Sequence, residues 1–148
     1  MHIFQEIKQG ILLKDSFPSN WDIRLRYLGT AGFVFSSHDR TIVVDPYVSR
    51  PSAWKSATQK LTPDLARIQS YIPEANDVLV GHAHHDHILD APDLCRLTGA
   101  RLIGSPSVCN VGRAAGLPES QLLETLGGEE IQCGHHVVRG LPSKHGKV

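Results

Sequence analysis

The sequence contains no long apolar stretch, and this absence argues against a membrane protein. No run approaches the about 18 consecutive apolar residues that a membrane-spanning helix needs. The first residues, Met1 to Glu6, also lack the basic and then apolar pattern of a secretory signal. We therefore expect a cytoplasmic protein with no membrane partner.

The sequence has no excess of charge of either sign. Lys and Arg together number 15, and so do Asp and Glu, which makes the formal net charge zero. The basic residues are scattered rather than gathered into one patch. Because proteins that bind nucleic acid generally carry a basic face, we expect no nucleic-acid partner and regard a small-molecule substrate as the expected ligand.

Cysteine is scarce. Cys95, Cys109 and Cys133 are odd in number and form no C-x-x-C pair. This pattern argues against a disulfide framework and against a zinc site built from thiolates. Free cysteines behave as small apolar side chains, so we expect all three to be buried and unreactive.

The composition that remains is that of an ordinary globular domain. Of the 148 residues, 41% are hydrophobic and 20% are charged. A chain of this length buries roughly 68–70% of the surface that its unfolded form exposes. No internal repeat or low-complexity tract divides the sequence, so we expect a single domain across residues 1–148.

The apolar patterns predict an α/β fold in which strands and helices alternate. In the first strand, Ile23, Leu25 and Tyr27 alternate with arginines and are expected to face the core. Residues 47–62 are polar and are expected to form a loop. The expected strands are residues 22–28, 33–35, 41–44, 78–80, 101–103, 129–133 and 136–141, and the expected helices are residues 63–72, 91–97 and 106–115.

Four of the nine histidines fall within six residues, from His82 to His87, directly after an expected strand. Side chains two positions apart in an extended turn share one side, so His82 and His84 can converge on one metal ion. Asp86 and His87 add a carboxylate and another imidazole on the other side of the turn, where a second ion about 3.5–4 Å away fits. His85 is expected to point elsewhere.

This set of ligands favours zinc, with iron or manganese as alternatives, because it combines imidazoles with one carboxylate. A competing interpretation is a solvated, histidine-rich turn that binds metal only incidentally. The cluster is internal, follows a buried-strand pattern and precedes a helix. That context favours a site built to hold one or two metal ions.

The motif His82-x-His84-x-Asp86-His87 after a strand resembles the signature of the metallo-β-lactamase superfamily. The segment from Tyr27 to Gly32 and the strand of residues 41–44 are similar to the opening strands of that superfamily. The L-ascorbate-6-phosphate lactonase-like branch is the one most similar in character. The resemblance implies an αββα sandwich, of which this apparently truncated domain holds the first half, a mixed sheet with helices on one face.

The resemblance also implies how the first metal ion is held. In the superfamily, the residues that match His82 and His84 bind one zinc together with a histidine from a later strand end, and His145 fits that place. His135 and His136 compete for the same role. Both lie in an expected hairpin, where His136 can simply occupy a strand position, so His145 is preferred.

By the same resemblance, Asp86 and His87 match the residues that hold a second zinc. Asp45 matches an aspartate that supports the metal ligands from behind without binding metal. Such support is physically reasonable because a metal-bound imidazole usually donates its other N–H to a carboxylate. The alternative for Asp45 is an aspartate that begins a turn before Pro46.

The function that the resemblance implies is zinc-dependent hydrolysis of an ester, lactone or phosphoester by a metal-activated water, which Asp86 orients. Superfamily members of full length continue into a second half that supplies a bridging aspartate and another histidine. The alternative is therefore an inactive metal-binding fragment or interaction module. Because half a sandwich exposes an apolar sheet face, we expect a homodimer or a complementing second half.

Trp54 lies in the expected loop and has two interpretations. It flanks a substrate pocket, as the corresponding loop does in proteins that this chain resembles, or it anchors the loop by packing.

Overall fold

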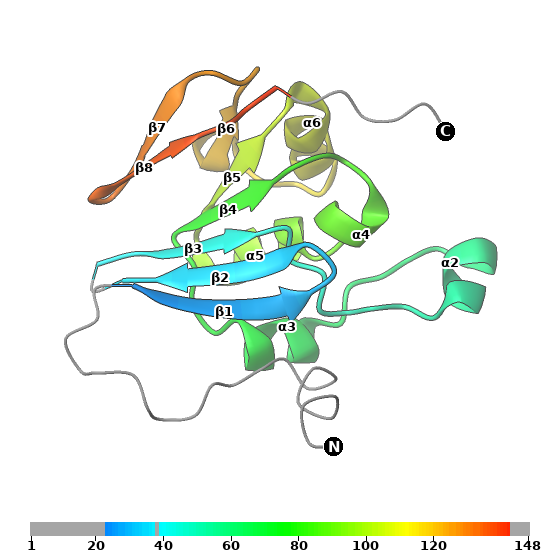
Figure 1. Ribbon diagram of the computed structural model, residues 1–148. Helices are drawn as coiled ribbons and strands as arrows, with labels where there is room; N and C mark the ends of the chain where they lie inside the picture. Colours follow the sequence, from blue (N-terminus) through cyan, green and yellow to red (C-terminus); the bar gives the residue numbers. More distant parts are fainter. Residues whose placement is uncertain (1–22, 38, 143–148) are drawn as a thin grey trace.

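A six-stranded mixed sheet forms the centre of the fold (Figure 1). The computed structural model describes residues 23–142 apart from residue 38. The first three strands pair antiparallel, and the next three continue the sheet in parallel. The strands lie in the order β1 (Arg24–Gly29), β2 (Gly32–Ser36), β3 (Thr41–Val44), β4 (Asp77–Val80), β5 (Arg101–Gly104) and β6 (Leu122–Glu124).

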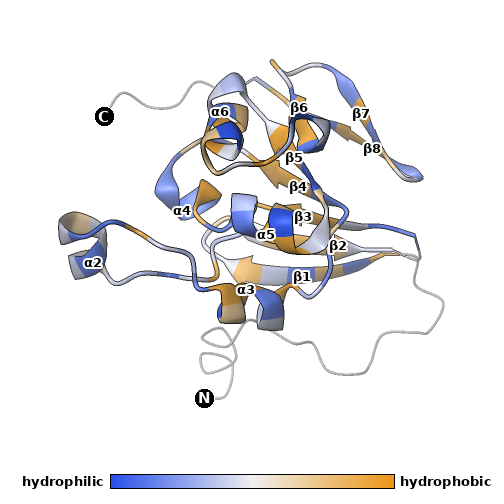
Figure 2. Cartoon of the chain, turned by 180° about the vertical axis from the view of Figure 1, so that it is seen from behind, coloured by the Kyte–Doolittle hydropathy of each residue, from blue (hydrophilic) through white to orange (hydrophobic). Residues whose placement is uncertain are grey.

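Helices cover one face of this sheet, as Figure 2 shows from the helix side. Parallel strands need a crossover connection, and a helix returns the chain across the sheet while burying an apolar stripe. Ile68, Leu94 and Val108 are each fully buried from this side against Val43 and Leu102. The helices are α2 (Ala53–Thr58), α3 (Leu65–Tyr71), α4 (His85–Ile88), α5 (Ala91–Thr98) and α6 (Pro106–Ala114), with a 3-10 turn η1 (Glu119–Gln121).

These elements confirm the expected α/β class and the mixed sheet with helices on one face. Within the described ranges, no helix has the length and apolar character that crossing a membrane requires. Two short elements near the end of the sheet, η1 and β6, were not predicted. Each has three residues, which is too few for a periodic pattern to emerge.

A second, two-stranded sheet lies on the opposite face and consists of β7 (Glu130–Cys133) and β8 (His136–Arg139). It is the expected hairpin. Ile131 and Cys133 point inward and pack with Ile42 and Ile103 of the large sheet. The hairpin therefore covers the part of the sheet that contains β3 to β6.

The apolar residues of β1 remain exposed, which corrects the expectation that they face the core. Ile23, Leu25 and Tyr27 are 49%, 53% and 37% exposed. Leu28, on the helix side of the same strand, is buried. Apolar and polar residues do alternate along β1. Its apolar face stays exposed because, among the described residues, the hairpin does not extend over β1.

Residues 47–62 are not entirely a loop, because they include α2. Ser52 caps this helix by accepting a hydrogen bond from the N–H of Lys55 at 3.3 Å. The helix buries none of its residues and projects from the fold (Figure 1), so it has no apolar stripe that a sequence pattern would reveal. Trp54 is 71% exposed, and the expectation that it anchors the loop by packing is wrong.

An ion cluster joins the large sheet to the hairpin at the end of the strands opposite α4. Asp77 is completely buried and accepts hydrogen bonds from Arg40 and Arg101, each at 2.7 Å. Arg101 also donates to the carbonyl of Gln132 in β7 at 2.9 Å. Burial favours the neutral acid, but the two guanidinium groups outweigh it and lower the pKa of Asp77.

Candidate metal centre

The histidine cluster lies at the carboxyl ends of two neighbouring parallel strands. β3 ends at Val44, which is in register with Leu79 of β4. Asp45 directly follows β3, and His82 follows β4 after one glycine. Because parallel strands end at the same edge of a sheet, the fold brings these two segments together where ligands commonly bind in α/β proteins.

Three imidazole rings gather at this edge. The ring centroids of His82 and His84 are 4.5 Å apart, and those of His82 and His87 are 4.0 Å apart. The structure thus brings His82 and His84 together, as the spacing predicted. His87 was expected on the other side of the turn. The helical turn α4 instead places its ring against His82, while His85 turns away and meets Tyr47 edge-on at 6.1 Å.

Asp45 holds the segment from behind. Its Oδ1 accepts a hydrogen bond from the N–H of Gly81 at 2.7 Å, and its Oδ2 lies 2.9 Å from Nδ1 of His87. The second contact is off the direction of a standard hydrogen bond, so Nδ1 is buried without one. Asp45 makes these contacts from a left-handed backbone conformation, with φ of 44°, which aspartate tolerates better than most residues.

Asp86 faces the opposite side of the His87 ring. Its Oδ2 is 3.7 Å from Nε2 of His87, beyond hydrogen-bond range, and its side chain is 40% exposed. Asp45 lies at the Nδ1 side of the His87 ring, so the lone pair on Nε2 of His87 points to the side where Asp86 lies. An imidazole nitrogen and a carboxylate oxygen that face each other in this way form a suitable pair of metal ligands.

The described side chains do not complete a metal site by themselves. Across residues 23–142, leaving aside residue 38, no three His, Cys, Asp or Glu side chains are grouped to hold an ion. The rings of His82 and His84 meet edge-on at 75°, and those of His82 and His87 are tilted by 48°. His145, the predicted third ligand of the first ion, lies outside the described residues.

The two competing histidines lie at the other end of the sheet. His136 Nε2 is 2.8 Å from Ser37 Oγ, and His135 Nδ1 is 2.5 Å from Asp39 Oδ2. Ser37 and Asp39 belong to the turn before β3, whereas Asp45 follows that strand. The structure therefore separates His135 and His136 from the histidine cluster by the length of β3.

Sequence reasoning missed Asp90, which ties the cluster to the loop after β3. This side chain is completely buried, and its Oδ2 accepts hydrogen bonds from the N–H groups of Val48 and Ser49 at 2.6 and 2.8 Å. Its Oδ1 is buried without a partner, and burial raises the pKa of Asp90. An aspartate just before Ala91 suggests a helix cap, but the side chain is used for this loop instead.

Tyr47 is a second residue that the sequence did not single out. Burial, together with the negative charges of Asp86 and Asp90, raises the pKa of its phenol. The phenol therefore stays neutral near pH 7 and keeps its proton to donate beside the cluster.

We expect Asp45→Asn to weaken metal binding by about 10–100-fold while leaving the fold intact. Asparagine keeps an oxygen for the Gly81 N–H and tolerates the positive φ, but it removes the negative charge beside His87. Zinc affinity is measured by competition with a chromogenic chelator, and thermal unfolding is followed on the metal-free protein. Unchanged affinity would show that Asp45 serves only the turn.

Comparisons with known proteins identify the family and the fold of this chain. The sequence family described as the β-lactamase superfamily domain matches residues 24–148. A relative from Pyrobaculum islandicum, named a UPF0173 metal-dependent hydrolase, is 30% identical over 133 residues, which are 82% of this chain and 54% of the relative.

Two solved structures share the fold. Igni18, a metallo hydrolase from Ignicoccus hospitalis, aligns with a TM-score of 0.55 at 24% identity, over 74% of this chain and 42% of that one. The metallo-β-lactamase SMB-1 aligns with a TM-score of 0.51 at 20% identity, over 78% and 48%. The chain thus spans about half the length of the proteins it matches. The lactonase-like branch stays a prediction. By its sequence match and its fold, this chain belongs to the β-lactamase superfamily domain family and has part of the metallo-β-lactamase fold.

Proposed function

We propose that this chain is the metal-binding part of a metal-dependent hydrolase that acts on an ester, lactone or phosphoester. The observation that carries the proposal is the alignment of Asp45, His87 and Asp86, in which one carboxylate orients the imidazole and the other faces its remaining nitrogen. The name of the Pyrobaculum islandicum relative supports the same reaction class.

The side chains fit a metal ion by their chemistry. His82 and His84 would hold one ion with His145, and Asp86 and His87 would contribute to a second. Imidazole with carboxylate favours zinc, with iron or manganese as alternatives. A metal ion bound here would supply the Lewis acidity that makes water a nucleophile near neutral pH.

The residues of this chain would prepare that chemistry in three ways. Asp45, placed at Nδ1 of His87, favours the tautomer that leaves Nε2 free to donate its lone pair. Where no second ion is bound, Asp86, whose side chain is 40% exposed, can instead orient the attacking water. Tyr47 keeps a neutral phenol, which can donate a hydrogen bond to an oxygen that gains negative charge.

A second candidate function is a metal-binding module without activity of its own. It is favoured by one observation: among the residues that the structure describes, no three ligand side chains converge. On this alternative, hydrolysis needs a complementing polypeptide that adds ligands. Binding of metal without hydrolysis by the chain alone would distinguish it from the leading proposal.

Removing and restoring the metal tests the leading proposal. The purified chain is treated with a chelator and assayed on a nitrophenyl ester, a lactone and a bis-nitrophenyl phosphate, before and after zinc, manganese or iron is added back. We expect one substrate class to be hydrolysed, the activity to disappear with the metal, and zinc to restore it best. Activity that survives complete metal removal would rule the proposal out.

A further inference from the structure

The end of the sheet that carries the histidine cluster also carries strained backbone. Among the described residues other than glycine, positive φ occurs at Thr30, Asp45 and Arg50, with values of 58°, 44° and 43°. Thr30 lies between β1 and β2, and the other two follow β3. In Figure 1, the β1–β2 turn, α4 and the chain leading to α2 all lie at one end of the sheet. Strain of this kind gathers at ligand sites, and the role of Asp45 leaves Arg50 to be explained.

Backbone carbonyls hold the side chain of Arg50 in place. Its Nη2 donates to the carbonyl of Leu28, and its Nε donates to the carbonyl of Tyr47 at 3.3 Å. The guanidinium lies over Gly29, where a Cβ atom would overlap Nη2 and where φ of 94° also favours glycine. Arg50 therefore joins the β1–β2 turn to the loop that presents Tyr47.

These contacts leave the charge of Arg50 without a counter-charge. The two carbonyls accept two of the five N–H donors of the guanidinium. The ion pairs among the described residues do not include Arg50, and the residue is exposed. A guanidinium that is already oriented and still has donors is suited to binding a carboxylate or a phosphate.

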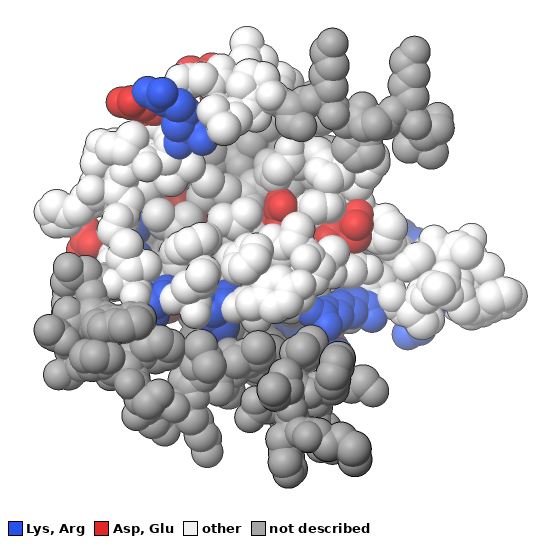
Figure 3. Space-filling view, viewed as in Figure 1, with Lys and Arg blue, Asp and Glu red and all other residues white. Residues whose placement is uncertain are grey.

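Arg50 also lies within electrostatic range of the candidate metal centre. Burial raises the pKa of Tyr47, the charges of Asp86 and Asp90 add to this rise, and the charge of Arg50 opposes it. The Tyr47 ring in turn meets His85 edge-on at 6.1 Å. Figure 3 shows acidic and basic side chains near one another on the side from which α2 projects. Arg50 therefore places a positive charge at the border of the site.

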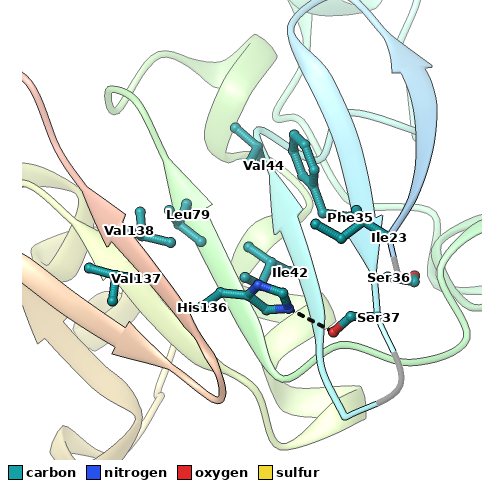
Figure 4. A pocket seen from close by; sticks show the side chains of 10 residues that line it. All are labelled: Ile23, Phe35, Ser36, Ser37, Ile42, Val44, Leu79, His136, Val137 and Val138. Atoms are coloured by element: carbon teal, nitrogen blue, oxygen red, sulfur yellow. Dashed lines mark hydrogen bonds between the residues drawn. The ribbon is translucent and has the colours of Figure 1, made fainter. Parts of the chain in front are cut away.

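The apolar groove between β2 and β8 does not offer such a group (Figure 4). Phe35, Ile42 and Leu79 line it with apolar side chains. Its histidine, His136, is bonded to Ser37 at the end of the sheet away from the cluster. A charged group in this groove would lose hydration without gaining a partner of opposite charge. Recognition of an anionic group is therefore better placed at Arg50.

We propose that Arg50 binds an oxyanion group, a carboxylate or a phosphate, that the substrate carries apart from the bond that is broken. The inference rests on the proposed hydrolase function and narrows the substrates to anionic ones. Because the carbonyls of Leu28 and Tyr47 orient the guanidinium beforehand, little side-chain freedom is lost on binding.

Binding is tested by titration calorimetry on the full, zinc-loaded chain. The probes are adipate and inorganic phosphate, and uncharged adipamide is the control ligand. Arg50→Gln removes the charge, and Arg50→Lys keeps it without the planar fork of donors. Arg24→Gln is the matched control variant, because Arg24 is also exposed but lies at the opposite end of β1 from Gly29.

We expect Arg50→Gln to weaken binding of one anion at least about tenfold, Arg50→Lys to weaken it less, and Arg24→Gln to stay within about twofold. The anion with the larger loss identifies the group recognised. Circular dichroism checks that the variants are folded. An adventitious ion only, or an ion held by zinc alone, would bind the wild type and Arg50→Gln alike and overturn the proposal. Equal losses in Arg50→Gln and Arg24→Gln would also overturn it.

Hydrolysis separates recognition by Arg50 from a purely structural role. Each anionic ester is compared with a neutral one of the same length: the 4-nitrophenyl monoester of adipate with 4-nitrophenyl hexanoate, or 4-nitrophenyl 6-phosphooxyhexanoate with its 6-hydroxy analogue, according to the anion that calorimetry identifies. We expect Arg50→Gln to lower kcat/KM at least about tenfold more for the anionic ester, mainly through KM. Equal losses would mean that Arg50 only joins the turn to the loop, and would overturn the proposal. Binding that depends on Arg50 without hydrolysis of any ester, lactone or phosphoester would contradict the hydrolase proposal alone.

Discussion

Replacing Asp77 with alanine is expected to lower the free energy of unfolding by about 3–5 kcal/mol. The carboxylate is completely buried and is the shared partner of Arg40 and Arg101. Its removal leaves two guanidinium groups without their counter-charge and weakens the link between Arg101 and the hairpin. The two arginine side chains are 24% and 34% exposed and can recover some hydration, so the lower end of this range is expected.

Urea unfolding of the metal-free chain at pH 7 measures this loss. Asp93→Ala is the matched control, since Asp93 pairs with Arg96 three residues away on the surface of α5. An exposed pair of this kind contributes only about 0–1 kcal/mol. Similar losses in the two variants would mean that the Asp77 cluster does not stabilise the fold as argued.

The same cluster predicts how stability depends on pH. The pKa of Asp77 is lowered in the folded chain, whereas an unfolded aspartate titrates near about 3.9. Its contribution is therefore present above about pH 3.9 and is lost as the pH falls through the lower, folded-state value. Cys133 does not interfere, because burial and the Asp77 charge raise its pKa to about 11. As the pH falls from 5 through the lowered folded-state pKa of Asp77, Asp77→Asn should lose less stability than the wild-type chain.

His84→Ala is expected to remove at least one metal ion per chain. The variant deletes one of two imidazoles whose rings lie 4.5 Å apart, and a metal centre with few protein ligands does not tolerate the loss of one. We expect affinity to fall by at least about 100-fold, more than the loss of a supporting carboxylate causes. Elemental mass spectrometry of the purified proteins gives the metal content directly.

Two further variants make this measurement specific. His136→Ala removes a histidine near Ser37, at the far end of the sheet, and should keep the wild-type metal content. His145→Ala should behave like His84→Ala if His145 is the third ligand. Two ions in the wild-type chain would indicate that Asp86 and His87 hold one of them. Absence of metal from the wild-type chain after growth in zinc would contradict the proposed centre.

The histidine cluster and the β-α alternation could be predicted from the sequence because both depend on local patterns. The spacing of His82 and His84 after a strand-like run places two imidazoles on one side whatever the rest of the chain does. Likewise, the apolar runs of β3, β4 and β5 and the stripes of α5 and α6 are contained within single elements. These features required no knowledge of distant contacts.

Only the tertiary structure decided the partners that lie far apart along the chain. Asp45 meets His87 and Asp90 meets Val48 across 42 residues, and nothing local distinguishes these aspartates from ones that begin turns. Position relative to the sheet also separated His135 and His136 from the cluster. The alternation of apolar and polar residues in β1 predicted which face of the strand is apolar, but it could not predict whether another element buries that face. Burial depends on what packs against a strand, and among the described residues the hairpin ends before it reaches β1.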